Sequence, residues 1–414
     1  MDRSLDVGIV GCGFAGAAAA IFLARAGHRV SVFERAARPS AVGAGILLQP
    51  TGLEVLAELG LLPALLARGA RIHNLKARSS RGRVLFDLHY RRLVDGLFGV
   101  GMHRGALFAA LSGALDAAGA VLHAGVAVQA LKASPGRTSV VGADGVLGEY
   151  DLVLVADGAR SRLREQSSLT ARARPYAWGA LWFVGEDPDE RFAGTLSQIC
   201  DGTERMLGFL PTGFGPGDGC TPLVSLFWSQ RMDRIDTFRR DGLDAWRSTV
   251  LRYEPRAEAL LAQVHDEERI LVASYMDVVM RRCHHERVAY LGDAAHATSP
   301  QLGQGTNLAL MDARALARAV ERAPDVPSAL ARYSRERRAH TSFYGFASRM
   351  LTPFFQSRGR FLGALRDAVL PELGRLPLFE LEMLRTLAGV KRGLLRSNLE
   401  LGQRLFDRPD PRAR

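Results

Sequence analysis

Hydrophobic residues near the N-terminus fall into short runs that are separated by glycine-rich or polar breaks. Residues 7–10 form a short apolar run, which is typical of a buried parallel strand. Residues 17–26 are rich in alanine and predict a helix, and residues 29–33 predict a second strand. The order strand, helix, strand predicts a βαβ unit, the building block of a parallel sheet.

Further along the chain, alternating patterns and turn residues predict more strands and helices. Residues 72–77 and 84–88 flank a polar turn and predict a hairpin, and residues 138–141 and 145–147 predict another. Strands are also expected at 121–123, 126–132 and 151–156, and helices at 52–59 and from Arg104 to about residue 118.

The pattern changes near residue 175. Aromatic-rich runs at 176–184, 206–210 and 223–229 predict an antiparallel sheet with one face on a cavity. A helix is expected at 243–253, after which residues 269–280 and the apolar strand 288–291 return to the earlier pattern. Beyond Arg338 the chain is expected to be helical and broken at its prolines. An inserted aromatic sheet therefore interrupts the first type of domain.

The composition is ordinary for a globular protein except for an excess of arginine. With 414 residues, 47% of them hydrophobic and 23% charged, the chain has room for two or three domains. Its net charge of +11 is almost wholly arginine, because Lys76, Lys132 and Lys391 are the only lysines. The charge fits attraction of anionic substrates, of phosphate groups or of a membrane surface, or a simple compositional bias. No nucleic-acid motif is present, so no nucleic acid is expected as a partner.

The N-terminal apolar segment and the cysteines argue against export and against a metal site. Residues 15–26 are too short to span a membrane and contain Arg25, so a cytoplasmic protein is expected. The four cysteines are scattered, without zinc spacing or a disulfide framework. Cys283-His284-His285 is expected to be a solvated loop ahead of the next strand, and no metal is expected.

The first motif is the turn Gly11-Cys12-Gly13-Phe14-Ala15-Gly16 between the first strand and its helix. Glycines at this spacing allow a tight turn, approach of a pyrophosphate to backbone N–H groups, and close packing of the helix on the strand. Glu34 ends the second strand, where a carboxylate that binds a ribose belongs. The context predicts a dinucleotide site.

The second motif is Gly292-Asp293, which follows the apolar strand 288–291. About ten residues later the glycine-rich turn Gly303-Gln304-Gly305-Thr306-Asn307 opens a helix. The carboxylate suits the hydroxyls of a polyol chain, and the helix N-terminus suits a developing anion. This pair of features favours a flavin over a bare nucleotide.

A third motif, Asp157-Gly158-Ala159-Arg160-Ser161-Arg162-Leu163-Arg164, lies between the other two. In this order the motifs resemble the single-component FAD-dependent aromatic hydroxylases, the group related to p-hydroxybenzoate hydroxylase and salicylate hydroxylase. The resemblance covers roughly the first 340 residues. Gly43-Ala44-Gly45-Ile46 also resembles the group, whereas Pro50-Thr51-Gly52 departs from its frequent Pro-Asn-Gly, which puts a flavin role of Thr51 in doubt.

The resemblance implies an α/β fold with a Rossmann-like FAD-binding domain of the GR2 type. We expect this domain to be discontinuous and to comprise residues 1–71, 92–174 and 270–340. An antiparallel-sheet substrate domain would comprise 72–91 and 175–269, and a helical C-terminal segment 341–414.

The resemblance also implies roles for single residues. Glu34 would accept the ribose hydroxyls, Arg35 would flank the adenine, and Val128 would meet the adenine edge. Arg104 would meet the phosphates or ribityl chain as a donor fork, and Asp293 would bind the ribityl hydroxyls. The turn before the second-motif helix would face the flavin N1–C2=O edge, where reduction places negative charge. The expected cofactor-binding residues are Gly11, Gly13, Phe14, Ala15, Gly16, Glu34, Arg35, Gly45, Arg104, Val128, Asp157, Asp293, Gly303, Gly305, Thr306 and Asn307.

The chemistry implied is hydroxylation of a small phenolic or heteroaromatic molecule with O₂, through a flavin C4a-hydroperoxide. NADH or NADPH would reduce the FAD, and Asp157 with Gly158 would also serve the approach of that cosubstrate. A monomer or homodimer is expected, and a peripheral membrane contact is a less favoured alternative. The alternatives are a flavoenzyme of the same fold doing epoxidation, Baeyer–Villiger oxidation or reduction, and a non-catalytic FAD-binding protein.

The substrate side is less defined by the sequence. Trp182, Phe209 and Phe227 are candidates for the pocket wall, with Pro300 near the flavin. His296 is expected to pack near the pyrophosphate side rather than to act as a base. The catalytic base stays open; the candidates, without ranking, are Tyr90, His73 and Tyr275.

Overall fold

The N-terminal βαβ pattern forms the centre of a six-stranded sheet in the computed structural model, which describes residues 4–39, 44–394 and 401. Four of its strand pairs are parallel, and only the short edge strand runs antiparallel to its neighbour. The strands, in spatial order, are β17 (His284–His285), β18 (Val288–Tyr290), β11 (Leu152–Val155), β1 (Asp6–Val10), β2 (Arg29–Glu34) and β7 (Val121–Ala124). The central strands β1 and β11 are buried almost throughout, as their uninterrupted apolar runs predict.

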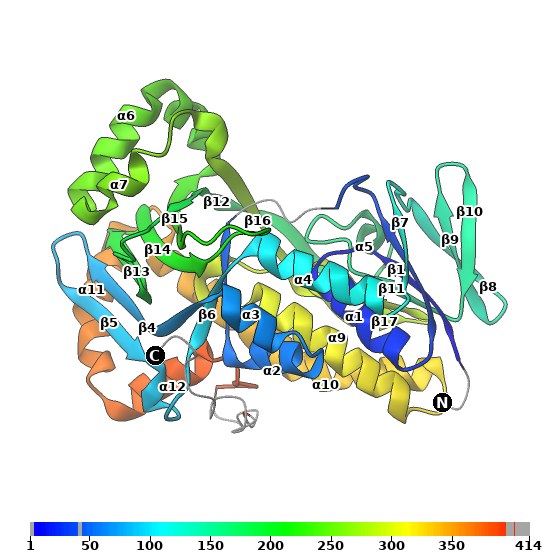
Figure 1. Cartoon of the computed structure of the whole chain (residues 1–414). Helices are drawn as coiled ribbons and strands as arrows, with labels where there is room; N and C mark the ends of the chain where they lie inside the picture. Colours follow the sequence, from blue (N-terminus) through cyan, green and yellow to red (C-terminus); the bar gives the residue numbers. More distant parts are fainter. Residues whose placement is uncertain (1–3, 40–43, 395–400, 402–414) are drawn as a thin grey trace.

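A second, three-stranded antiparallel sheet stands at one end of the molecule, at the right of Figure 1. Its strands are β8 (Ala130–Ser134), β9 (Arg137–Gly142) and β10 (Gly145–Tyr150). The predicted hairpin of β9 and β10 is confirmed. The predicted strand at 126–132 is wrong at its start, because the Val126 amide donates to the Glu34 carbonyl at 2.9 Å and the chain joins the sheet only at Ala130.

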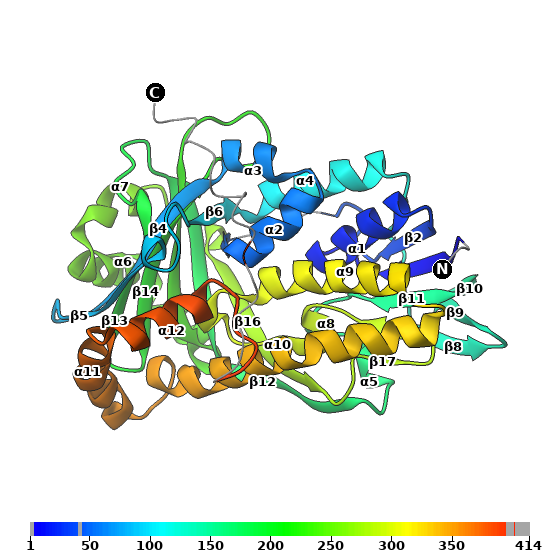
Figure 2. The same ribbon diagram turned by 90° about the horizontal axis from the view of Figure 1, so that it is seen from below.

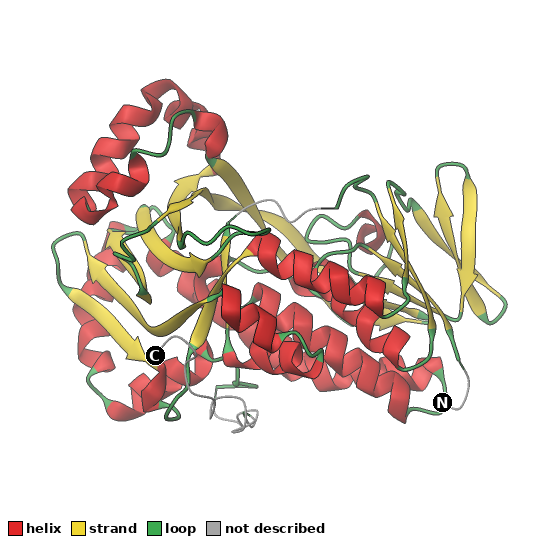
Figure 3. Ribbon diagram, viewed as in Figure 1, coloured by secondary structure: helices red, strands yellow, loops and turns green. Residues whose placement is uncertain are grey.

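The three aromatic runs form three neighbouring strands of a nine-stranded sheet (Figure 3, yellow). The predicted hairpin at 72–77 and 84–88 belongs to it as β4 (Ala70–Ser79) and β5 (Val84–His89), and β4 also pairs in parallel with β13 (Gly194–Asp201), a strand that was not predicted. The strands are β16 (Leu271–Met280), β12 (Thr170–Glu186), β15 (Leu223–Arg231), β14 (Arg205–Gly213), β13 (Gly194–Asp201), β4 (Ala70–Ser79), β6 (Gly99–His103) and β3 (Gly45–Leu48), with β5 (Val84–His89) paired to β4.

Helices cover both faces of this arrangement. In Figure 1, α6 (Ile235–Tyr253) and α7 (Glu258–Leu261) cover the outer side of the large sheet, and in Figure 2 α9 (Gly305–Arg322) and α10 (Val326–Phe355) run side by side across the molecule. The α-helices are α1 (Phe14–Arg25), α2 (Pro50–Glu58), α3 (Leu62–Arg68), α4 (Arg104–Ala117), α5 (Arg162–Glu165), α6 (Ile235–Tyr253), α7 (Glu258–Leu261), α8 (Asp293–His296), α9 (Gly305–Arg322), α10 (Val326–Phe355), α11 (Arg360–Gly374) and α12 (Pro377–Leu387). Short 3-10 helices are η1 (Tyr90–Arg92), η2 (Met232–Arg234), η3 (Pro255–Ala257), η4 (Glu267–Arg269) and η5 (Pro300–Leu302).

The main hydrophobic core joins α1, α2, α4 and α9 to the strands between them. A separate core lies between the large sheet and α6 and α7. The predicted α/β fold, with an antiparallel sheet and a helical C-terminal segment, is confirmed. Within the described ranges, no helix combines the length and the apolar character that crossing a bilayer requires.

Candidate functional site

The glycine turn between β1 and α1 has the geometry that its spacing predicts. Gly11 has a positive φ of 98°, and a Cβ on Gly16 would lie only 2.0 Å from the carbonyl oxygen of Gly11. Gly13, the N-cap of α1, instead faces open space, with no described atom within 4 Å of a Cβ placed there. The N-terminal amides of α1 therefore face a cradle that a side chain at Gly13 would fill.

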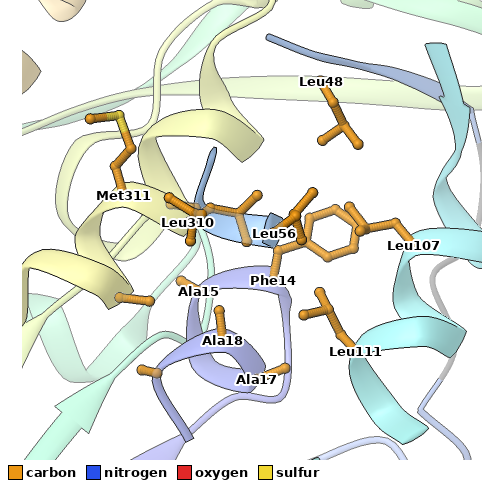
Figure 4. Packing of buried hydrophobic residues seen from close by; sticks show 14 of the residues in the cluster. Phe14, Ala15, Ala17, Ala18, Leu48, Leu56, Leu107, Leu111, Leu310 and Met311 are labelled. Atoms are coloured by element: carbon orange, nitrogen blue, oxygen red, sulfur yellow. The ribbon is translucent and has the colours of Figure 1, made fainter. Parts of the chain in front are cut away.

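Phe14 and Ala15 use their side chains for packing. Phe14 points between Leu107 and Leu111 of α4 (Figure 4), and the guanidinium carbon of the exposed Arg104 lies 5.4 Å from its ring centroid. Ala15 lies against Gly292, because a Cβ added to Gly292 would lie 3.1 Å from the Cβ of Ala15. The first and second motifs, far apart in the sequence, are therefore in contact.

The polar residues at the ends of β2 and β11 lie beside the glycine turn. The Glu34 carboxylate accepts from the Cys12 amide and from the Ala36 amide, both at 2.9 Å. The half-buried Val128 belongs to the loop that pairs with Glu34. Asp157 has a buried Oδ1 without a hydrogen-bond partner among the described residues.

Charges around Asp157 complete this edge. Burial raises the pKa of Asp157 against the opposing effects of Ser161, Arg164 and Arg35. Arg164 is itself fully buried and donates to the Ala294 carbonyl at 3.0 Å. An orphaned buried carboxylate oxygen beside a cation is a place where a polar ligand group gains a hydrogen bond.

Asp293 and the start of α9 form the other half of the site. Gly292 has a positive φ of 57°, and the exposed Asp293 follows it as the first residue of α8. A Cβ on Gly305 would lie 3.8 Å from Asp293 Oδ1, so the carboxylate and the N-terminus of α9 are neighbours. Gly303 is left-handed, with φ of 61°, and no described side chain caps the helix. The amides of Gly305 and Thr306 stay available.

Asn307 and Gly45 hold the fold around this turn. The Asn307 side chain, fully buried, donates to the Leu47 and Gly303 carbonyls and accepts from the Gln49 amide. The Gly45 amide donates to Ser225 Oγ at 2.7 Å. The amide side chain of Asn307 is therefore committed to protein groups, and only its backbone faces the start of the helix.

Behind the site lies a buried polar chain that the sequence analysis missed. Asp312 accepts from the Gly292 amide at 2.8 Å and from Arg337 Nε at 2.6 Å, and His296 Nε2 lies 2.6 Å from it. Although burial opposes its ionisation, His296 and Arg337 hold the pKa of Asp312 well below its usual range. A carboxylate inside the apolar run Ala309 to Ala313 was the signal for this chain in the sequence.

His296, the last residue of α8, lies against Asp312 of α9, and its expected place near the pyrophosphate stays a prediction. Cys283-His284-His285 is not the solvated loop that was expected. His284 and His285 form β17 against β18, and burial raises the pKa of Cys283 to about 12. Among the described residues, no group of three or more His, Cys, Asp and Glu is placed to hold a metal ion.

On the large sheet, Trp182 and Phe227 form one aromatic wall, with ring centroids 5.1 Å apart. Trp182 Nε1 donates to the Tyr275 hydroxyl at 3.1 Å, and burial raises the pKa of Tyr275 to about 12. The assignment of Phe209 to this wall is wrong. Phe209 stacks on Phe192 at 4.4 Å within the core under α6 and α7, because the strand pairing turns it to the opposite face.

Of the three candidate bases, only Tyr275 lies at this wall. Tyr90 is fully buried and donates to Gln49 Oε1 at 2.6 Å, and burial raises its pKa strongly. His73 is exposed on β4. Pro300 opens η5, directly before the turn at Gly303.

A cavity of about 260 Å³ lies elsewhere, between α6 and the large sheet. Trp228, Trp246 and Arg231 are among its lining residues. Trp228 follows Phe227 on β15 and therefore points to the opposite face of the sheet. This cavity is separate from the aromatic wall.

Comparisons with known proteins identify the family. The family model described as FAD binding domain matches residues 4–343. The chain is 32% identical over 340 residues to 3-amino-4-hydroxybenzoate 2-monooxygenase of Streptomyces cremeus, covering 79% of this chain and 81% of that protein. It is 31% identical to 2-heptyl-3-hydroxy-4(1H)-quinolone synthase of Mycobacteroides abscessus over 343 residues, covering 79% of this chain and 84% of that protein.

Solved structures share the fold. P. aeruginosa PqsL in complex with 2-aminobenzoylacetate has a TM-score of 0.73 at 28% identity, covering 88% of this chain and all 100% of that one. Klebsiella pneumoniae HpxO complexed with FAD and uric acid has a TM-score of 0.78 at 20% identity, covering 92% of this chain and 97% of that one. The chain belongs to the FAD binding domain family and is a flavin-dependent monooxygenase of the aromatic-hydroxylase group.

Proposed function

We propose that this protein uses NADH or NADPH and O₂ to hydroxylate a small phenolic or heteroaromatic molecule on FAD held between α1 and α9. The observation that carries the proposal is the contact between the two motifs. Gly292 touches Ala15 of the glycine turn, and Asp293 lies beside the start of α9. The carboxylate and the two helix N-termini, neither of which a described side chain caps, would thus line one site.

The residues present fit this cofactor. The open cradle at Gly13 and the free amides of α1 would take the pyrophosphate. Glu34 would accept the ribose hydroxyls, with Arg35 and Val128 at the adenine and Arg104 as a donor to the phosphates or ribityl chain. The orphaned Asp157 Oδ1 would accept a hydrogen bond at the same edge, where the nicotinamide cosubstrate would also approach.

Asp293 would bind the ribityl hydroxyls, and the start of α9 would stabilise negative charge on the flavin edge. Amides at Gly305 and Thr306 point from the positive end of an 18-residue helix dipole. Gly303 and Gly305 keep side chains away from this edge, and the Asn307 side chain fixes the turn from behind. When bound and reduced, FAD supplies the electrons that activate O₂.

The aromatic wall would hold the substrate ring. Trp182 and Phe227 offer apolar faces that exclude water. The Tyr275 oxygen already accepts from Trp182, so its own proton is free to donate to a phenolic or carbonyl oxygen of the substrate. With its pKa raised to about 12, Tyr275 suits a hydrogen-bond donor that orients the ring better than it suits a base at neutral pH.

We also propose the discontinuous domain division. Residues 1–71, 92–174 and 270–340 would bind FAD, 72–91 and 175–269 would bind substrate, and 341–414 would form the C-terminal helical segment, of which residues 395–400 and 402–414 lie outside the described part of the chain. The parallel pair of β4 and β13 supports it, because it joins the two stretches of the substrate domain. The strands β3 and β6, which extend the same sheet, would connect the domains.

The function is tested with purified protein and added FAD. Oxidation of NADPH and of NADH is followed with a panel of phenolic and heteroaromatic compounds. The molecular masses of the products are measured by mass spectrometry after reaction in ¹⁸O₂. A substrate that stimulates cosubstrate oxidation and gains one ¹⁸O atom supports the proposal. Reduction of a substrate without oxygen gain, or no stimulation by any aromatic compound while FAD is bound, contradicts it.

A further inference from the structure

The C-terminal end of α12 is held by side chains from three other elements. The carbonyl oxygens of Thr386, Leu387, Ala388 and Gly389 are consecutive, and each faces a different side-chain hydrogen-bonding group. A helix leaves its last carbonyls without partners, and water or nearby amides usually satisfy them. Here distant parts of the chain satisfy them inside the protein. We call residues 386–389 the clasp.

The four side chains come from α2, α10 and the turn before α9. Tyr344 donates to Thr386 at 2.8 Å, Gln304 to Leu387 at 2.6 Å, and Thr51 to Ala388 at 3.4 Å. His340 Nε2 lies 2.8 Å from the Gly389 carbonyl. All four residues are buried. Because buried hydrogen bonds are costly to break, the clasp has a fixed place against these elements.

Gln304 gives the clasp a direct link to the candidate flavin edge. It stands between Gly303 and Gly305 and is the N-cap residue of α9, yet its side chain makes no capping bond. Its amide group instead points away from the helix, to Leu387. A Cβ on Gly389, which has a positive φ of 88°, would lie 3.2 Å from Gln304 Oε1, so the clasp packs closely on this side chain.

A second link runs from the clasp to the other half of the site. Arg337 Nη1 lies 2.7 Å from His340 Nδ1 and donates to it, since a guanidinium cannot accept. The proton of a neutral His340 therefore sits on Nε2 and is donated to Gly389. Arg337 continues to Asp312, and Asp312 accepts from the Gly292 amide directly before Asp293. Both halves of the site are thus connected to one short segment.

We propose that the clasp is a positioning element for the Gly303–Gly305 turn, and that Gln304 is the positioning residue through which the clasp holds this turn in place. The proposal rests on the proposed function insofar as the turn faces the flavin. Two flanking glycines allow many conformations, so the turn needs an external constraint to present its amides in one direction. The hydrogen bond from Gln304 to Leu387 supplies that constraint.

The test compares Gln304→Met with the matched control Tyr344→Phe. Methionine keeps the length of the side chain and removes its donor. Tyr344→Phe removes another hydrogen bond to the clasp, but Tyr344 makes no hydrogen bond to the turn. Hydrogen–deuterium exchange of the peptide that contains residues 303–308 is measured without FAD, and affinities for oxidised and reduced FAD are measured separately.

We expect exchange in this peptide to rise about tenfold in Gln304→Met and to stay within about twofold of wild type in Tyr344→Phe. Gln304→Met should also weaken binding of reduced FAD about fivefold more than binding of oxidised FAD. The reason is that amides of the turn that point in other directions no longer stabilise the negative charge of the reduced flavin. Unchanged exchange in Gln304→Met, or an equal rise in both variants, would overturn the clasp. If wild-type protein bound no FAD, the proposed function would fail, whereas the exchange comparison would still decide whether the clasp holds the turn.

Discussion

The backbone amide of Gly292 donates to the carboxylate of Asp312, which is fully buried and also faces Arg337 and His296. One charged side chain on α9 thereby fixes the residue that precedes Asp293. The chemistry expected of the exposed Asp293 depends on a carboxylate that no solvent reaches.

Replacement of this buried charge should destabilise the protein strongly. Asp312→Asn leaves Arg337 buried without its counter-charge, so the free energy of unfolding should fall by about 3 kcal/mol. Urea denaturation of the FAD-free protein measures this loss. Asp293→Asn is the matched control, and its exposed carboxylate predicts a change within about 0.5 kcal/mol. Equal effects of the two substitutions would contradict the assigned roles.

The same residue predicts a pH dependence of stability. The folded-state pKa of Asp312 is lowered, so its contribution is fully present above the unfolded-state pKa of about 3.9 and is lost as the pH falls below it. The difference in unfolding free energy between wild type and Asp312→Asn should therefore be constant from pH 7 to about 5 and shrink below about pH 4. A difference that grows on acidification would refute this assignment.

Replacement by alanine should affect FAD binding at one glycine of the first motif and folding stability at another. Gly13→Ala meets only open space at an allowed φ of −74°, so the FAD-free protein should keep its stability while FAD affinity falls about tenfold or more. Gly16→Ala meets the Gly11 carbonyl at 2.0 Å and should destabilise the fold itself. Thermal unfolding without FAD and fluorescence titration with FAD separate the effects. Unchanged FAD affinity in Gly13→Ala would count against the pyrophosphate cradle.

On the substrate side, Tyr275→Phe should act on the aromatic substrate and leave FAD binding intact. Loss of one orienting hydrogen bond should raise KM about fivefold and lower the yield of hydroxylated product per NAD(P)H consumed. Tyr90→Phe, which removes only the buried bond to Gln49, should cost about 1–2 kcal/mol of stability without changing KM. Steady-state kinetics with product quantification measure both. A reversed pattern would place the substrate near Tyr90.

Local patterns predicted the elements that touch the glycine motifs. The apolar runs at β1 and β11, the alanine-rich α1 and the glycine turn at α9 depend on short-range properties that a sequence displays directly. The strands β6 and β13 escaped prediction, because Gly99–His103 and Gly194–Asp201 show little alternation and owe their strand form to pairing with β4.

Long-range relations account for the other misses. Successive side chains of β14 point to opposite faces of the sheet, so Phe209 faces away from the residues next to it. The sequence of the strand alone does not say which of the two faces packs against α6. Asn307 was expected to face the cofactor with its backbone, which stays a prediction, but the bridge from its side chain to Leu47, 260 positions away in the sequence, was not predicted. Contacts of this kind depend on how distant elements pack, and no local pattern of residue types encodes them.

Titration of FAD into wild type and Asp293→Ala tests whether FAD lies between Asp293 and the starts of α1 and α9. Wild type should bind FAD in a one-to-one complex. Asp293→Ala, with unchanged thermal stability in the FAD-free form, should bind FAD at least about tenfold more weakly because the ribityl hydroxyls lose their acceptor. Equal affinity of the two proteins, or no binding by wild type, would contradict this placement of FAD.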